Sequence, residues 1–390
     1  MDFSYSDEQK MIAETARKVG ERFGLEYWRD LDERKAFPAE IWQAICEAGL
    51  AGAALPAEYG GAGLGVLELA LIIEQLSAAG GGATLGQLFM INPIFGGVSV
   101  SKFGTPQMKQ ELLPALLEGR MNFCMALTEP DAGSNSLEIK TFASADGTGW
   151  RVNGRKVWIT AVPDAQKMLV VARTKRLEES KSRSDGLSMF MIDTVREGLS
   201  HSAIDKVGTR TLASSSVFFD NVRVEPGELV GTLHGGWREL VDVLNTERIV
   251  TTAALVGAGE LSIRLAVNYA NERKVFGARP ISAYQGLQFP LAQCHAEIES
   301  ARLLNHKAAS NFDAGLPYSS ESNAAKLLAA QAVARATERS MQTMGGMGYA
   351  KEYHVERLWR DARLFRFAPI SEEMILNYIA VHDLGMPRSY

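Results

Sequence analysis

The sequence predicts an α+β fold in which two helical parts flank a middle part made of β-strands. Apolar residues recur at helical spacing over about 6–119, and the same spacing returns after 236 and continues to the end of the chain. Between these parts, over about 122–229, short apolar runs alternate with turn signals. With 390 residues, the chain is also longer than a single hydrophobic core usually organises. The expected domains are residues 1–121, 122–232 and 233–390.

The first helical part is predicted to begin at Ser6, which is followed three residues later by Gln9. This spacing is typical of a capping box, in which each side chain bonds the backbone N–H of the other residue. One face of the helix is then apolar, with Ile12, Ala16, Val19 and Phe23. Prolines and glycine clusters divide the rest of this part into further helices, with breaks at Pro38, Pro56, 60–65 and 80–82.

The middle part is predicted to consist of short strands joined by tight turns. Runs at 140–145, 150–153 and 156–160 are separated by Asp146-Gly-Thr-Gly149 and Asn153-Gly154. Both separators are strong hairpin signals. Further strands are expected at 168–172, 187–192 and 216–224, and the charged stretch 176–185 is expected to form an exposed loop.

The last part is predicted to hold long helices around 237–270, 283–313, 319–344 and 371–383. An acidic residue lies on the apolar stripe of the first of them, which consists of Leu240, Leu244, Glu247, Thr251, Ala254 and Ala258. A buried carboxylate is costly unless it is paired or used, and burial raises its pKa toward the range of a general base. From the residues alone, Glu247 is equally well interpreted as a general base or as half of a structural ion pair, for example with Arg248.

Composition argues against several classes of function. A net charge of −5, with 46% hydrophobic and 22% charged residues, gives no electrostatic bias toward nucleic acids or anionic membranes. Cys46, Cys124 and Cys294 are far apart and form no Cys-x-x-Cys pair, so neither a disulfide framework nor a zinc site is expected. No metal motif, Walker loop or Gly-x-Gly-x-x-Gly fingerprint occurs. Without a signal peptide or a long uninterrupted apolar stretch, we expect a cytoplasmic protein that binds no metal, membrane or nucleic acid.

Two segments carry the strongest functional signal: Met125-Ala-Leu-Thr-Glu-Pro-Asp-Ala-Gly-Ser-Asn135 and Lys156-Val-Trp-Ile-Thr160. In the first, the hydroxyls of Thr128 and Ser134 flank a turn that leaves backbone N–H groups free for an acceptor-rich ligand. In the second, Trp158 can cover one face of a flat ring while Thr160 bonds its edge. Either segment alone is better interpreted as a turn that enters a strand. Together they favour a flavin site.

Three more segments follow in order: Asn271-Glu-Arg-Lys-Val-Phe-Gly277, Gln342-Thr-Met-Gly-Gly-Met-Gly-Tyr349 and Arg360-Asp-Ala362. With the two segments above, the chain resembles the acyl-CoA dehydrogenase family of flavoproteins over nearly its whole length. The resemblance implies a particular form of the α+β fold, with an N-terminal helical domain, a middle β-barrel-like domain and a C-terminal four-helix bundle. It also implies FAD as the cofactor, held between the β-domain and the C-terminal helices and reaching a neighbouring subunit.

The resemblance assigns cofactor contacts to two subunits. On the flavin of the same chain it places Leu127, Thr128, Gly133, Ser134, Trp158 and Thr160. On the nucleotide part of a neighbour's FAD it places Arg273, Phe276, Gln285, Gln342 and Gly346, and it adds Ser371 and Glu373 as matches to cofactor-contacting positions. It places Ser134 and Arg248 near the acyl-CoA substrate. From spacing alone, Arg273 is a solvated helix end and the glycines at 345–348 are a helix C-cap.

The chemistry that the resemblance implies is α,β-dehydrogenation of an acyl-CoA thioester, in which a carboxylate removes the α-proton. In many family members this base is a glutamate shortly after the Arg-Asp-Ala segment, but the matching position here is Pro369, which cannot accept a proton. Other branches, such as isovaleryl-CoA dehydrogenase, place the base on the first long helix after the β-domain, where this chain has Glu247. We therefore expect Glu247 to be the catalytic base.

The resemblance further implies a homotetramer that binds acyl-CoA and passes electrons to an electron-transferring flavoprotein. The length and branching of the acyl chain stay open. Two other kinds of function are compatible with the sequence. One is a flavin-dependent oxidase, monooxygenase or enoyl-CoA reductase on the same fold. The other is a noncatalytic flavin-binding protein that has lost its base. The reason to consider it is that Pro369 occupies the position of the base in many family members.

Overall fold

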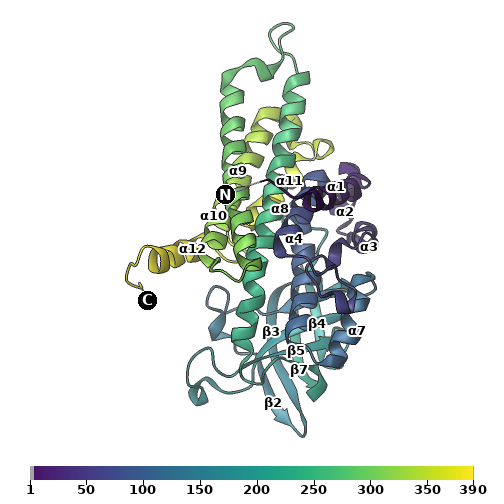
Figure 1. Cartoon of the computed structure of the whole chain (residues 1–390), viewed down its shortest axis with the longest axis vertical. Coiled ribbons are helices and arrows are strands. Elements are labelled where there is room, and N and C mark those ends of the chain that lie inside the picture. Colours follow the sequence, from purple (N-terminus) through teal and green to yellow (C-terminus); the bar gives the residue numbers. More distant parts are fainter. Residues whose placement is uncertain (1–3, 390) are drawn as a thin grey trace.

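The computed structural model describes residues 4–389, and its N-terminal part is helical, as predicted (Figure 1). The expected capping box is present: Ser6 Oγ accepts a hydrogen bond from Gln9 N at 3.1 Å, and Gln9 Oε1 accepts one from Ser6 N at 3.0 Å. Segments of π-helix at Ser77–Gly81 and Met90–Val98 join the later helices. The helices are α1 (Asp7–Glu21), α2 (Gly24–Arg34), α3 (Ala39–Glu47), α4 (Val66–Leu76), α5 (Thr84–Phe89), α6 (Ser99–Phe103) and α7 (Pro106–Leu117).

The middle part forms one eight-stranded sheet within the described residues, with the order β6-β7-β3-β2-β4-β5-β8 and with β1 paired in parallel to β4. Its apolar faces form a core of their own, in which Val152, Phe190 and Val217 are fully buried. The strands are β1 (Phe123–Ala126), β2 (Phe142–Asp146), β3 (Gly149–Thr160), β4 (Lys167–Arg173), β5 (Leu187–Asp193), β6 (Leu199–Ile204), β7 (Ser214–Val224) and β8 (Leu229–Val230).

The prediction of a hairpin at Asn153-Gly154 is wrong, because β3 runs through these residues as one strand of 12 residues. The register against β7 shifts between Val152 and Gly154, and the extra residue is on β7, so the dipeptide lies opposite a β-bulge rather than in a turn. Glycine is needed there, because a Cβ would lie 2.4 Å from the Thr141 hydroxyl oxygen. The structure also contains β6, an edge strand of mostly exposed residues that lacks the apolar pattern on which strand prediction depends.

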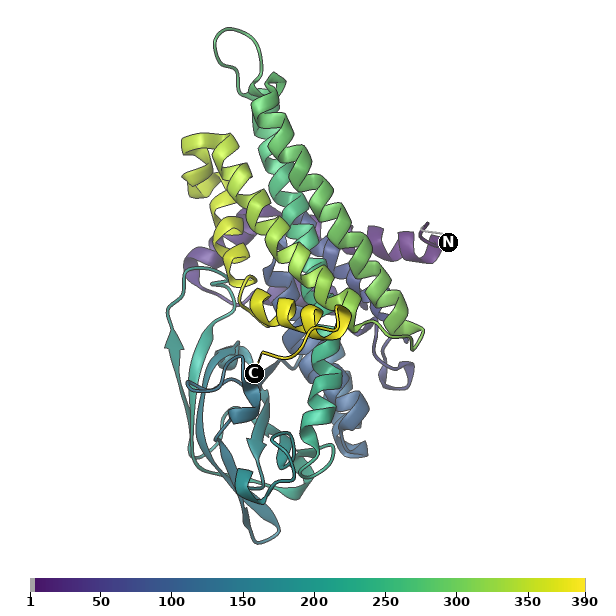
Figure 2. The same cartoon turned by 90° about the vertical axis from the view of Figure 1, so that its left-hand side faces the viewer.

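The C-terminal part is built on three long helices, which run side by side in Figures 1 and 2. The loop 273–284 joins the first two at the end of the molecule farthest from the sheet. All three lie close to their predicted bounds, and the fourth predicted helix is α12 followed by π-helix at Ile379–Asp383. The helices are α8 (Gly236–Glu272), α9 (Gln285–Asp313), α10 (Ser319–Met344), α11 (Val355–Leu364) and α12 (Glu372–Tyr378).

A buried charged cluster joins the three parts of the chain. Asp32 of α2 pairs with Arg360 of α11 at 2.6 Å, and Asp361 accepts a hydrogen bond from Thr209 N in the loop between β6 and β7. Both carboxylates are at most 3% exposed. The Arg360-Asp-Ala362 segment therefore holds α11 against the N-terminal helices and the sheet.

One helix in the described part of the chain, α8, is long and apolar enough to cross a membrane by length and composition alone. However, 78% of its most apolar window is buried inside the structure, where it packs against α4, α9 and α10. A central place in the core explains this composition. Cys46, Cys124 and Cys294 are buried free thiols, as predicted.

Candidate active site

Glu247 lies on the buried face of α8, which confirms the position predicted from the apolar stripe. Its side chain is 6% exposed, while Leu240 and Thr251 on the same face are 0% and 2% exposed. Neighbouring helices approach this face closely, since a Cβ on Gly86 of α5 would lie 2.6 Å from Ala254 Cβ. α8 therefore carries the Glu247 carboxylate into the interior of the protein.

The Glu247 carboxylate has no hydrogen-bond or ion-pair partner among residues 4–389. Arg248, the partner considered above, instead donates from Nη1 to Asn245 Oδ1 at 2.7 Å. Burial raises the pKa of Glu247 to about 7, against the opposing effect of the positive charges on Arg248 and Lys326. A carboxyl group with this pKa exchanges protons near neutral pH, as a general base must.

The segment 365–371 is fixed to α10. Lys326 Nζ donates hydrogen bonds to Phe365 O and to Ile370 O, both at 2.7 Å. Pro369 belongs to this segment and brings no titratable group. Downstream, Ser371 is the N-cap of α12 and Glu373 is exposed in the first turn of that helix.

The two motif segments 125–135 and 156–160 meet where β1 ends beside β3. Val157 N donates to Thr128 O at 2.9 Å, and Lys156 Nζ donates to Leu127 O at 2.8 Å. Lys156 is fully buried and pairs with Glu129 at 2.9 Å. These contacts explain why the two segments occur together: the second holds the first in place.

Trp158 stands out from the sheet near the end of β3. Its φ is 62°, and the register of β3 against β7 shifts between Lys156 and Ile159. The bulge turns the indole outward, so that 56% of this large side chain is exposed. The nearby hydroxyls of Thr128, Ser134 and Thr160 make no hydrogen bond within the described chain.

Of the other predicted cofactor residues, Arg273, Phe276 and Gln285 lie in or beside the loop at the far tip of the bundle, and Gln342 and Gly346 lie at the C-terminal end of α10. Arg273 is about 26 helical residues from Glu247, which corresponds to about 39 Å along α8. Phe276 in the same loop is 99% exposed. All members of this distal group are exposed: Arg273, Phe276, Gln285, Gln342 and Gly346. A single chain therefore does not bring this group together with Trp158.

The residues present fit FAD. An exposed indole and unpaired hydroxyls suit the face and edges of an isoalloxazine ring. In the distal group, the Arg273 guanidinium has no ion pair within the described chain, and a Cβ on Gly346 would meet nothing within 4 Å. An open, cationic surface of this kind suits a pyrophosphate.

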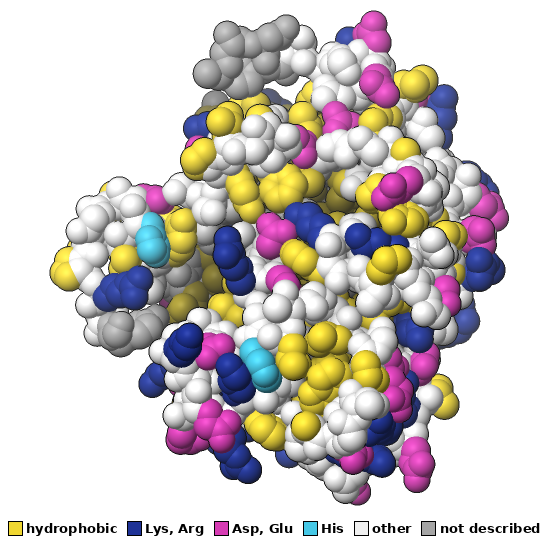
Figure 3. All heavy atoms as spheres, turned by 60° about the horizontal axis from the view of Figure 1, so that its bottom comes forward, with side chains coloured by type: hydrophobic (Ala, Val, Ile, Leu, Met, Phe, Trp, Pro, Cys, Tyr) yellow, Lys and Arg dark blue, Asp and Glu magenta, His cyan; other side chains and the backbone are white. Residues whose placement is uncertain are grey.

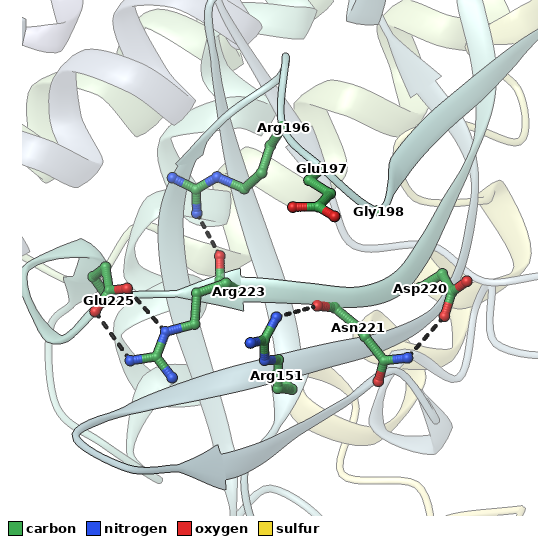
Figure 4. Close-up of a pocket in the computed structure, with 8 residues that line it drawn as sticks. All are labelled: Arg151, Arg196, Glu197, Gly198, Asp220, Asn221, Arg223 and Glu225. Carbon is green, nitrogen blue, oxygen red and sulfur yellow. Dashed lines mark hydrogen bonds and ion pairs between the residues drawn. The ribbon is translucent and has the colours of Figure 1, made fainter.

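A separate pocket of about 480 Å³ lies on the outer surface of the sheet and contains none of the predicted site residues (Figure 4). Its three arginines already have acidic partners: Arg151 with Asp146, Arg223 with Glu225, and Arg196 with Glu228. On the face shown in Figure 3, acidic and basic side chains are interspersed around a group of hydrophobic side chains. Neither feature provides an anion-binding site.

Comparisons with known proteins identify the chain. Acyl-CoA dehydrogenase family models match residues 6–120 (N-terminal domain), 124–222 (middle domain) and 234–382 (C-terminal domain). Acyl-CoA dehydrogenase FadE12 of Mycobacterium tuberculosis is 39% identical over 390 residues, covering 100% of this chain and 99% of its own. A 3-(aryl)acrylate reductase of Clostridium sporogenes is 32% identical, covering 92% and 94%. The solved glutaryl-coenzyme A dehydrogenase in complex with glutaryl-CoA superposes with a TM-score of 0.94 at 29% identity, covering 100% and 98%.

The fold and these comparisons define the protein as an oxidoreductase that acts on acyl-CoA. The chain belongs to the acyl-CoA dehydrogenase family. Its helical N-terminal, sheet and helical C-terminal parts confirm the predicted three-domain architecture. Members of this family are FAD-dependent oxidoreductases that act on acyl-CoA, so the predicted enzyme class and cofactor are confirmed as well.

Sequence reasoning missed two buried lysines that organise the site, Lys156 and Lys326. In both cases the spacing of the lysine from buried residues in the same element indicates that the lysine is buried. Lys156 follows Val152 at an even spacing in a strand, which places it on the same buried face. Lys326 lies four residues after Ser322 and seven before Val333, which places it on the buried stripe of its helix.

Proposed function

We propose that this protein catalyses α,β-dehydrogenation of an acyl-CoA thioester to the trans-2-enoyl-CoA, with Glu247 as the base that removes the α-proton. FAD, when bound, supplies the acceptor for the β-hydrogen and its electron pair. The observation that carries the proposal is the Glu247 carboxylate, which is buried, has no hydrogen-bond partner among residues 4–389 and has its pKa raised to about 7. Pro369 at the other base position of the family leaves that role to Glu247.

Burial makes Glu247 suitable for removing the α-proton. At neutral pH the carboxylate form is accessible, and it receives the α-proton as the Cα–H bond of the thioester breaks. The product of this transfer is a neutral carboxylic acid, which an apolar environment favours over the charged form. Its burial keeps bulk water away from the carboxylate.

We assign the flavin to Leu127, Thr128, Gly133, Ser134, Trp158 and Thr160, and the nucleotide part of a neighbour's FAD to Arg273, Phe276, Gln285, Gln342 and Gly346. The exposed indole, the unpaired hydroxyls and the unpaired guanidinium support this assignment. Ser134 and Arg248 are assigned to the substrate, and Arg248 Nε is buried without a hydrogen-bond partner in the described chain. Ser371 and Glu373 are assigned to the cofactor by the family resemblance, although the Ser371 hydroxyl also caps α12.

The assembly that follows is a homotetramer in which each FAD is shared between two chains. The separation of about 39 Å between Glu247 and Arg273 supports the sharing of each FAD between two chains, because one chain cannot present both groups to one cofactor. The tetramer is proposed from the family resemblance. We further propose domain bounds at 1–121, 122–232 and 233–390, electron-transferring flavoprotein as the acceptor, and a cytoplasmic location. The three unpaired thiols suit a reducing compartment.

A second candidate is reduction of an enoyl or arylacrylyl substrate at the same site. The similarity to the 3-(aryl)acrylate reductase supports it, since that relative is 32% identical over 92% of this chain. In this direction the protonated form of Glu247 would deliver the α-proton. The same residues serve both directions. The direction is therefore decided by the reduction potential of the bound flavin relative to that of the substrate pair.

Anaerobic titration of the FAD-loaded protein with a series of saturated acyl-CoA thioesters tests the proposal. We expect at least one member to bleach the flavin absorbance and to yield the enoyl-CoA. Rapid reoxidation by oxygen would indicate an oxidase. Flavin that no saturated acyl-CoA bleaches, but that an enoyl-CoA reoxidises after chemical reduction, would indicate a reductase. Flavin that responds to none of these ligands would contradict catalysis and favour the noncatalytic relative.

A further inference from the structure

Lys156 of β3 is fully buried, and its ammonium makes two contacts. It donates a hydrogen bond to Leu127 O at 2.8 Å and pairs with Glu129 Oε1 at 2.9 Å. The Glu129 carboxylate is held in turn by two backbone groups, because it accepts hydrogen bonds from Lys140 N at 2.6 Å and from Thr141 N at 2.9 Å. The ion pair therefore has one fixed position relative to the Leu127 carbonyl.

The Leu127 carbonyl belongs to the same peptide group as the N–H of Thr128. The next carbonyl, Thr128 O, accepts a hydrogen bond from Val157 N at 2.9 Å, so β3 holds the chain on both sides of this N–H. The Thr128 N–H itself makes no hydrogen bond to residues 4–389, and Thr128 is only half-buried. Buried backbone N–H groups are almost always paired, so a fixed and unpaired N–H of this kind is available to a ligand.

We propose that the Thr128 N–H is a hydrogen-bond donor to the edge of the flavin ring, and that Lys156 is the positioning residue that fixes and polarises this donor. The inference rests on the proposed function, which assigns Thr128 to the flavin, and it adds the atom that makes the contact. Lys156 acts through the Leu127–Thr128 peptide, because its own side chain is enclosed by protein.

The charge on the ammonium explains the polarisation. A charged donor on a carbonyl oxygen draws electron density along the peptide group, which strengthens the N–H of that group as a donor. The oxygen and nitrogen atoms on the edge of a flavin ring become more negative when the ring is reduced. A strengthened N–H at this edge therefore stabilises the reduced flavin more than the oxidised flavin, and it raises the reduction potential.

Two variants separate this role from simple support of the fold. The double variant Lys156→Met and Glu129→Gln removes both charges and the hydrogen bond to Leu127 O, whereas Glu129→Gln alone keeps the ammonium. In the double variant we expect FAD to bind about tenfold more weakly. We also expect its two-electron reduction equilibrium to fall about tenfold, which lowers the potential by about 30 mV. Glu129→Gln should keep or raise the potential, whereas loss of structural support alone would shift both variants in the same direction.

Lys140→Met is the control for charge near the same segment. The Lys140 side chain is 76% exposed, and the substitution keeps the backbone N–H that bonds Glu129. Because an exposed charge is screened by water, the FAD affinity and the reduction potential should stay at their wild-type values. Spectroelectrochemical titration measures the potential, and quenching of flavin fluorescence measures the affinity.

A measurement on the wild-type protein follows the proposed donor directly. Leu127-Thr128 is the one Leu-Thr dipeptide in the sequence. Protein labelled isotopically at leucine carbonyl carbons and threonine amide nitrogens therefore gives a single peak in an NMR spectrum that correlates each amide with the preceding carbonyl. We expect FAD to slow the exchange of this amide proton with solvent by about tenfold or more.

Unchanged exchange of the Thr128 amide on FAD binding would overturn the inference, even if the variants fail to fold. Equal potentials in the two folded variants, or potentials lowered alike, would overturn it as well. The proposed function fails by a different result, in which no acyl-CoA reduces the bound flavin. The exchange and potential measurements use no substrate, so they decide the inference in either case.

Discussion

Lys156, Lys326 and Glu247 are among the ionisable side chains that the structure buries, and each of the three is accommodated differently. Lys156 pairs with Glu129, and Lys326 is satisfied by two backbone carbonyls. Glu247 has neither kind of partner within the described chain. Because an unpaired buried charge destabilises the folded state, Glu247 is the one that stability alone does not explain.

Replacing this carboxylate should therefore stabilise the protein while removing its activity. The pKa of Glu247 is about 7 in the folded state against an ordinary value of 4.5, and at 1.36 kcal/mol per pH unit the difference corresponds to about 3 kcal/mol. A raised carboxyl pKa means that the folded state loses stability as pH rises from 4.5 to 7. We expect urea unfolding at pH 8 to show Glu247→Gln more stable than wild type by this order.

The pH dependence provides the check on that prediction. Below pH 4.5 Glu247 is protonated in both the folded and the unfolded wild type, so the increase in unfolding free energy from Glu247→Gln should vanish. Glu111→Gln, on the exposed face of α7, should show no gain at either pH. A Glu247→Gln protein that is less stable than wild type at pH 8 would show that the carboxylate has a stabilising partner after all.

At the scale of elements, the sequence predicts regular helices and strands from the spacing of apolar residues, but it does not predict local irregularities such as bulges. The spacing around Glu247 in α8 predicts its burial, because a helix repeats the same face over many turns. In β3 the dipeptide Asn153-Gly154 carries a turn signal, yet pairing with β7 on one side and close approach to Thr141 on the other keep it in the strand, opposite a bulge of β7. Such contacts come from other strands, so a local pattern does not contain them.

The bulge in β3 leads to a prediction about Trp158. Its indole is 56% exposed, so Trp158→Ala should leave the unfolding midpoint of the FAD-free protein unchanged. Loss of an aromatic face against the cofactor should weaken FAD binding about tenfold, measured by quenching of flavin fluorescence. Trp359→Ala, 42% exposed on α11, is the control. Equal FAD affinity in the two variants would remove Trp158 from the flavin site.

At the scale of the whole molecule, the sequence predicts three parts in their correct order but not how the parts meet. Asp32 and Arg360 are 328 residues apart in the chain and pair across two domains. Lys326 likewise meets a segment about 40 residues downstream. The motifs quoted from the sequence gave candidate cofactor residues, whereas the groups that support them are defined by tertiary contacts.

The exposed tip of the bundle should depend on a second chain. If Arg273 reaches a neighbour's FAD, Arg273→Ala should weaken FAD binding and subunit association together, because a ligand held by the assembled state stabilises that state. Light scattering after size exclusion, with and without added FAD, measures both. Arg120→Ala, at an arginine that is 64% exposed far from this tip, should assemble normally. A monomeric Arg273→Ala protein with full FAD content would refute the shared site.

The central claim is that Glu247 accepts the α-proton, and anaerobic stopped-flow reduction of the bound FAD by an acyl-CoA substrate tests it most directly. Glu247→Gln keeps the shape of the side chain and removes its basicity, so reduction should slow by about 10²-fold or more at unchanged FAD content. Pro369→Ala should reduce at close to the wild-type rate, because no proton passes through that position. Near-normal reduction in Glu247→Gln would contradict the account.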